Sequence, residues 1–197
     1  MFGMKKLSYA DLNQQQVVDI RSQADYQIGH LEHSLNLNMG NFKKYSLNFL
    51  KVDEPLVFIT GAESETELAE LLEIANEHGF NNVEGYLSIE AIPAEELKQT
   101  ALISAKDLFT TNGEFILLDV RHPDEITRLA PETNLVNVPL EELAKSTDLL
   151  DPNKKIYTLC GSGNRGTTAS SFLEDLGYQT TVIAGGMKAV EELQNKL

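Results

Sequence analysis

Short, nearly apolar runs recur along the chain, separated by segments whose apolar residues are spaced to fall on one face of a helix. The clearest runs lie at residues 17–20, 56–59, 115–120 and 156–159. Near-continuous apolar strands that alternate with amphipathic helices are typical of a parallel sheet with helices on both faces. The pattern therefore predicts an α/β protein whose reactive loops lie at the carboxyl ends of strands.

The same pattern occurs twice. Residues 17–21 (VVDIR) return as 117–121 (LLDVR), and residues 56–61 align with 155–160, so the offset is close to 100 in each case. Because few insertions separate the copies, we predict two copies of one α/β unit. Residues 1–95 are assigned to the first domain and residues 101–197 to the second. A charged linker is expected at 92–100.

The second copy shows the clearest succession of elements. Its strands are predicted at 115–120, 135–138, 155–159 and 180–184. Its helical segments are predicted at 105–109, 140–150 and 165–176. Gly177 stands where the glycine that ends a helix belongs. Each domain is therefore expected to be a mostly parallel sheet with helices on both faces.

Composition restricts the classes of function. Of 197 residues 42% are apolar, and no run approaches the ~20 apolar residues of a membrane span. The net charge of −14 disfavours nucleic acid and anionic membranes as partners. The one cysteine argues against a secreted, disulfide-stapled protein. A reactive thiol survives best in a reducing compartment, so a cytoplasmic location is expected.

That cysteine, Cys160, opens a glycine-rich loop between a predicted strand and a predicted helix. Such a turn directs successive backbone N–H groups and a helix N-terminus at one point. These groups favour a thiolate, and helix N-termini lower a thiol pKa by roughly one to several units. Cys160 and Arg165 are therefore the predicted catalytic residues, the alternative being a small buried cysteine after a strand. The residues predicted to bind substrate are Gly161, Ser162, Gly163, Asn164 and Gly166.

The spacing Cys-x-x-Gly-x-Arg between a strand and a helix resembles the active-site loop of the rhodanese superfamily, whose sulfurtransferases carry sulfur as a cysteine persulfide. Residues 19–31 (DIRSQADYQIGHL) are similar to the N-terminal signature of that family. The resemblance implies two rhodanese-like domains. Cysteine phosphatases have a related signature, but their loop is one residue longer than the four residues between Cys160 and Arg165, which also disfavours an arsenate reductase.

The two copies differ at this loop. Residues 60–65 of the first copy read TGAESE, so Gly61 takes the place of the cysteine and the arginine is missing. Each carboxylate there repels an anion by about 1 kcal/mol. The first copy is therefore predicted to be non-catalytic, with a structural or recruiting role.

Other polar residues are expected to be structural. His30 and His33 have no third ligand nearby, so neither a metal nor another cofactor is expected, and His30 is expected to fix a turn. Asp119 and Arg121 are expected to pair at a strand end. His122 is interpreted as a loop histidine rather than a base. In the last loop, Gly185-Gly186 matches paired glycines of the family, which implies close backbone approach or positive φ.

The resemblance implies that Cys160 takes the outer sulfur of thiosulfate or of a low-molecular-weight persulfide and passes it to a thiol acceptor. Many loops of the family have a large or cationic residue after the cysteine, where this chain has Gly161. Turnover is therefore expected to be slower with thiosulfate than with a persulfide. The alternative, from another class, is a non-catalytic tandem module that binds or regulates a sulfur-handling enzyme, with the first domain holding the protein partner.

Overall fold

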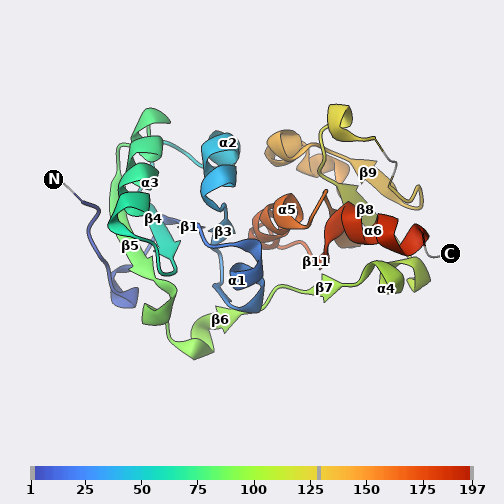
Figure 1. The fold of residues 1–197 in the computed structure, drawn as a ribbon, viewed down its shortest axis with the longest axis horizontal. Coiled ribbons are helices and arrows are strands. Elements are labelled where there is room, and N and C mark those ends of the chain that lie inside the picture. Colours follow the sequence, from blue (N-terminus) through green and yellow to red (C-terminus); the bar gives the residue numbers. More distant parts are fainter. Residues whose placement is uncertain (1–2, 128–129, 196–197) are drawn as a thin grey trace. The chain divides into compact units, whose positions relative to one another are not determined.

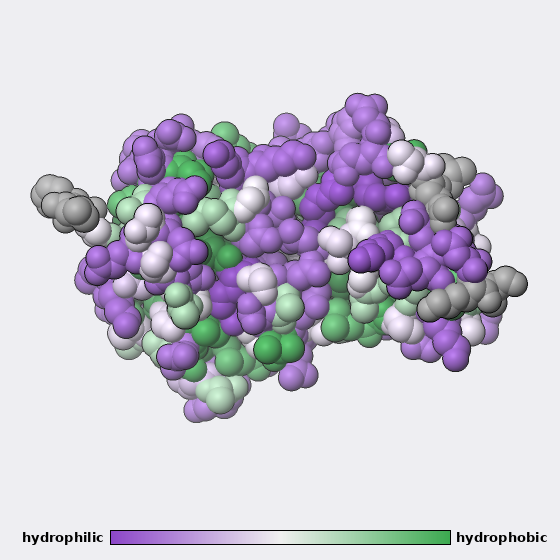
Figure 2. Space-filling model, in the orientation of Figure 1, coloured by the Kyte–Doolittle hydropathy of each residue, from purple (hydrophilic) through white to green (hydrophobic). Residues whose placement is uncertain are grey.

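The computed structural model describes residues 3–127 and 130–195. It divides the chain into two units, Met1–Gln99 and Thr100–Leu197, each with its own parallel sheet and helices (Figure 1). The predicted α/β class is confirmed. Among the described helices, none is both long and apolar enough to cross a membrane. Hydrophilic side chains cover much of the face drawn in Figure 2, in keeping with the net charge of −14.

The first unit is built on a parallel sheet with the strand order β3-β1-β4-β5. Its strands are β1 (Gln16–Asp19), β3 (Leu35–Asn36), β4 (Leu56–Thr60) and β5 (Val83–Ser88). Its α-helices are α1 (Gln23–Ile28), α2 (Met39–Phe49) and α3 (Glu65–Glu77). Phe42 of α2 packs edge-on against Phe58 of β4, with ring centroids 5.2 Å apart, so α2 covers one face of the sheet. Val57 and Ile59 point to the opposite face and belong to a second apolar cluster.

Most of the segment predicted as a linker, residues 92–99, belongs instead to the first unit. Leu97–Lys98 forms strand β6, which pairs antiparallel with β2 (His30–Leu31). Ile92 is 5% exposed and packs in the same apolar cluster as Val57 and Ile59. The linker prediction was wrong for these residues because Ile92 and Leu97 are isolated large apolar residues in a short charged segment that also contains a proline, so the sequence pattern does not reveal their burial.

The second unit is built on a parallel sheet with the strand order β7-β11-β10-β8-β9. Its strands are β7 (Leu102–Ile103), β8 (Phe115–Asp119), β9 (Leu135–Asn137), β10 (Lys155–Leu159) and β11 (Thr180–Ile183). Its α-helices are α4 (Ala105–Thr110), α5 (Asn164–Asp175) and α6 (Gly186–Gln194). Segment 140–150 forms the 3₁₀ helices Leu140–Lys145 and Thr147–Leu149. The predicted strands and helical segments are confirmed to within a residue or two, and Gly177 has the left-handed φ of 87° expected after a helix.

Helices cover both faces of the second sheet. Leu117 of β8 and Leu159 of β10 pack in one cluster with Leu108 of α4 and Val190 of α6. On the other face, Thr158 of β10 donates a hydrogen bond from Oγ1 to a main-chain oxygen of α5 at 2.9 Å. Because neighbouring strand residues point to opposite faces, α5 lies against the face away from α4 and α6.

Both units repeat one hydrogen-bonded corner at the end of their first long strand. Asn36 Nδ2 donates to the main-chain oxygens of Asp19 and Arg21, both at 3.1 Å. Asn137 Nδ2 makes the two equivalent bonds in the second unit, at 2.8 and 3.0 Å. The repeat read from the sequence therefore extends to side-chain geometry.

Candidate active site

The predicted reactive loop lies at the carboxyl end of β10 and leads into α5. Gly163, with φ of 97°, takes the left-handed conformation that turns the chain into the helix, and α5 begins at Asn164. This turn points two amides at the cysteine. The N–H groups of Gly163 and Gly166 donate to Cys160 Sγ at 3.1 and 3.3 Å.

The cysteine is 1% exposed, as the alternative of a buried structural residue required. Its sulfur nevertheless faces backbone donors at the start of a helix of 12 residues, rather than apolar side chains alone. Hydrogen bonds donated to sulfur and the helix dipole both stabilise negative charge at this point. The loop therefore offers hydrogen-bond donors to a sulfur atom that carries negative charge.

Backbone amides at the start of α6 hold the Cys160 loop in place. Met187 N–H donates to the main-chain oxygen of Cys160 at 2.7 Å, and Lys188 N–H donates to that of Gly161 at 3.0 Å. Gly186 has φ of 58° and lies so close that a Cβ there would meet Cys160 O and would stand 2.8 Å from Gly163 N. The paired-glycine prediction is thus confirmed for both of its reasons, since Gly185 also has positive φ.

The Arg165 guanidinium pairs with a carboxylate from the segment after β8. Its Nη1 and Nη2 donate to Oε1 and Oε2 of Glu125 at 2.7 and 2.6 Å, a two-pronged pair in which Arg165 is 18% and Glu125 42% exposed. Such paired geometry is the strongest that arginine makes with a carboxylate. The pair with Glu125 is consistent with bracing of the loop, and the catalytic role predicted for Arg165 stays a prediction.

Glu125 itself was missed by the sequence reasoning. The residues lie 40 positions apart, so no helical or strand spacing links them. The available signal was the repeat, because Glu125 occupies the place that Asp25 occupies in the first copy, and an acidic residue recurs there.

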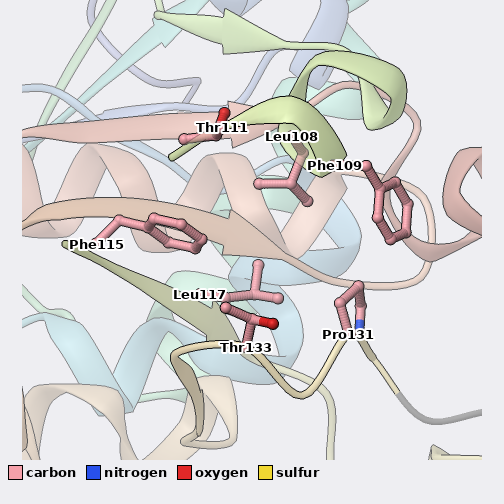
Figure 3. A pocket seen from close by; sticks show the side chains of 7 residues that line it. All are labelled: Leu108, Phe109, Thr111, Phe115, Leu117, Pro131 and Thr133. Carbon is pink, nitrogen blue, oxygen red and sulfur yellow. The ribbon is translucent and has the colours of Figure 1, made fainter. Parts of the chain in front are cut away.

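The remaining residues predicted to bind substrate all lie on this turn, but they differ in exposure. Ser162 is exposed, Gly161 and Asn164 are half-buried, and Gly163 and Gly166 are buried. In a separate place, an apolar cavity of about 110 Å³ lies between α4, β8 and residues 131–133 (Figure 3). Neither Cys160 nor Arg165 lines that cavity, so it is distinct from the loop.

A comparison with known families identifies the fold around this loop. The model of the rhodanese-like domain matches residues 5–88 and 103–193, which is most of the chain. The chain belongs to the rhodanese-like domain family. Because the two matched regions fall one in each unit, the protein consists of two rhodanese-like domains in tandem.

Several individual proteins are similar to parts of this chain. The "Putative sulfurtransferase YtwF" of Bacillus subtilis is 27% identical over 97 residues, which are 49% of this chain and 92% of that protein. The "Putative sulfur carrier protein YrkF" of the same organism is 29% identical over 130 residues, 65% of this chain and 64% of that protein. Among solved structures, a rhodanese-related protein from Thermoplasma volcanium is 33% identical, covers 47% of this chain and 91% of its own, and has a TM-score of 0.43.

In the second rhodanese-like domain, the other polar candidates are structural. Arg121 Nε and Nη2 donate to the carboxylate of Asp119 at 3.0 and 2.7 Å, and both residues are buried, so the predicted strand-end pair is confirmed. His122 begins a 3₁₀ turn, and its Nδ1 accepts a hydrogen bond from Asp124 N–H at 3.3 Å. These contacts account for His122 as a loop residue.

In the first rhodanese-like domain, the loop after β4 has no cysteine. Gly61 stands where Cys160 stands in the second domain, and Ser64 caps α3 by accepting a hydrogen bond from Glu67 N–H. His30 is 4% exposed, stacks on Tyr26 with centroids 4.0 Å apart, and contacts its main-chain oxygen through Nδ1 at 2.9 Å. That histidine fixes the turn as predicted. Within residues 3–127 and 130–195, no cluster of three or more His, Cys, Asp or Glu is placed to hold a metal.

Proposed function

We propose that the second rhodanese-like domain is a sulfurtransferase that carries a sulfane sulfur on Cys160. One observation carries this proposal: the N–H groups of Gly163 and Gly166 donate to Sγ at the start of α5. The sulfurtransferase and sulfur-carrier names of similar proteins support the same class of chemistry. A cytoplasmic setting suits it, since a reducing compartment keeps a lone thiol free.

The reaction has two displacement steps. The Cys160 thiolate attacks the outer sulfur of thiosulfate or of a low-molecular-weight persulfide, and the donor's S–S bond breaks as sulfite or a thiolate leaves. Cys160 then holds the outer sulfur as a persulfide. An acceptor thiolate attacks that sulfur, the new S–S bond breaks, and the Cys160 thiolate is restored. Because the chain has one cysteine, the acceptor thiol belongs to another molecule.

Preorganised amides supply the electrostatic part of this chemistry. Negative charge moves from Sγ to the outer sulfur and back, and the amides of Gly163 and Gly166 stabilise it without reorganising. In acyl transfer, removing one such donor costs roughly 2.7–4 kcal/mol of transition-state stabilisation. The same physical effect here favours the ionised form of the Cys160 persulfide over its protonated form.

Steady-state kinetics distinguish a covalent persulfide on Cys160 from a non-catalytic binding module. A covalent persulfide predicts ping-pong kinetics, with parallel lines in double-reciprocal plots of donor against acceptor concentration. A non-catalytic binding module predicts no transfer above the rate without protein. Intersecting lines would indicate a ternary complex instead and would contradict a persulfide on Cys160.

Replacing Glu125 with glutamine is expected to raise kcat/KM for thiosulfate about tenfold and to leave that for glutathione persulfide nearly unchanged. The substitution releases the Arg165 guanidinium, and a freed cation beside the loop attracts a dianion by about 1 kcal/mol or more. Asp124→Asn is the matched control, because it removes the same charge from the adjacent residue, whose side chain is 90% exposed. Equal loss with both donors would show that the pair only braces the loop.

Placing a cysteine in the first domain is expected not to restore sulfur loading. In a Cys160→Ala background, Gly61→Cys puts the new Cβ 3.7 Å from Glu63 Oε1, where a carboxylate opposes both a thiolate and an anionic donor. Intact mass after incubation with glutathione persulfide measures the outcome. Loading comparable to that of the unaltered chain would contradict the assignment of the first domain as non-catalytic.

A further inference from the structure

The first rhodanese-like domain contains a cavity of about 380 Å³ at the place equivalent to the active-site loop of the second. It opens between the end of β1 and the loop that follows β4. Gly61, which has no side chain, leaves this space unfilled. The residues that line the cavity are Ile20, Arg21, Ser22, Asp25, Gly61, Ala62, Glu63 and Ile89.

The residues that line this cavity carry net negative charge, whereas a site for an anion would be positive or rich in hydrogen-bond donors. The Arg21 guanidinium donates to Asp19 at 2.6 Å and to the main-chain oxygen of Gly29 at 2.7 Å, so its charge is neutralised inside the fold. Two further carboxylates, those of Asp25 and Glu63, belong to the lining residues. The lining therefore carries an excess of negative charge next to apolar walls.

Comparison of the two domains shows how this excess arises. In the second domain, the acidic residue at the equivalent of Asp25 is Glu125, which Arg165 neutralises. In the first domain the position of that arginine is taken by Thr66, at the offset of 99 that aligns Gly61 with Cys160. The first domain therefore has a carboxylate at this position but no arginine at the position equivalent to Arg165.

The surroundings of the Glu63 carboxylate independently indicate a site for a cation. Its Oε1 lies 3.7 Å from the position that a Cβ of Gly61 would take, so the carboxylate lies beside the missing side chain. Its Oε2 is shielded from solvent and has no hydrogen-bond partner among the described residues. A shielded carboxylate oxygen without a partner is unfavourable, and a cationic donor entering the cavity would satisfy it.

We propose that this cavity binds a primary ammonium group on an alkyl chain, with Glu63 and Asp25 as its counter-charges. The ammonium supplies the hydrogen bond that Glu63 Oε2 lacks, and the apolar walls formed by Ile20, Ala62 and Ile89 accept the methylenes. A metal ion fits less well, because hard cations need six or more oxygen ligands. The chemistry is that of a lysine side chain on a partner protein or of a free diamine. It does not depend on sulfur transfer in the second domain.

The test uses the full chain and follows the backbone amide signals of Gly61 and Glu63 by NMR during titration. The probes are N-acetyl-lysine-N-methylamide, putrescine, and N-acetyl-norleucine-N-methylamide as the neutral analogue. Saturable shifts with either amine and none with the norleucine compound are expected. Binding of the lysine compound alone assigns a protein side chain, and binding of putrescine alone assigns a free diamine. Equal shifts with the neutral analogue, or shifts with thiosulfate but with neither amine, overturn the proposal.

Three variants test whether the amine binds at Glu63 and beside Gly61. Glu63→Gln is expected to weaken amine binding about tenfold, whereas Glu65→Gln, two residues along and exposed, removes the same charge and should leave it within about twofold. Gly61→Leu keeps both carboxylates but occupies the part of the cavity beside Glu63, and should weaken binding at least tenfold. The amide spectrum of each variant shows whether the fold is kept. Equal weakening by Glu63→Gln and Glu65→Gln, or full binding by Gly61→Leu, overturns the site.

Discussion

Replacing Cys160 with serine is expected to lower sulfur transfer by about a thousandfold or more while the second domain keeps its fold. Serine is nearly the same size, and its oxygen accepts the same two hydrogen bonds from Gly163 and Gly166, but it forms no persulfide. Steady-state transfer from glutathione persulfide to a thiol acceptor measures the loss, and thermal unfolding measures the fold. Turnover above about a tenth of the native rate, with the fold intact, would place the nucleophile elsewhere.

Replacing Gly186 with alanine is expected to damage both the stability of the second domain and its transfer activity. A residue with a side chain at φ of 58° costs about 1–3 kcal/mol. The new Cβ would also stand 2.8 Å from Gly163 N and 2.9 Å from Ser162 N, which forces the loop away from its support on α6. The amides at Sγ then lose their positions, so turnover falls along with stability.

Gly161→Ala is the matched control for Gly186→Ala. Gly161 lies on the loop that Gly186 supports, but a Cβ at Gly161 would meet nothing within 4 Å and its φ is not left-handed. Hydrogen exchange of amides in β8, β10 and β11 measures the second domain, while β1 and β4 serve as an internal reference. If Gly161→Ala is as harmful as Gly186→Ala, support of the loop by α6 is not what positions the amides.

Much of the fold could be predicted because strong local signals agreed with the global pattern. The segment 156–159 is a mostly apolar run between Lys155 and the glycine loop, and it forms β10 together with Lys155. The duplicated VVDIR and LLDVR segments form equivalent strands β1 and β8 with matching asparagine contacts. Strand β6 could not be predicted, because a two-residue antiparallel pair depends on where β2 lies in space.

The candidate site was predictable in its residues but not in its contacts. Loop spacing located Cys160, and the strand–glycine–helix order predicted that amides would point at it. Residue spacing does not determine the direction of a long side chain, so the ion pair between Arg165 and Glu125 became visible only in the structure. The lone carboxylate oxygen of Glu63 was hidden for the same reason, since the sequence shows a charge but not its surroundings.

The central claim is that backbone amides around Cys160 hold an ionised sulfur that accepts and keeps a second one. Intact mass spectrometry after incubation with glutathione persulfide, followed by peptide mapping, tests it most directly. The account predicts that the chain gains one sulfur atom, carried by the peptide that contains Cys160, and that an added thiol removes it. An unchanged mass, with the thiol still present and the protein folded, would contradict it.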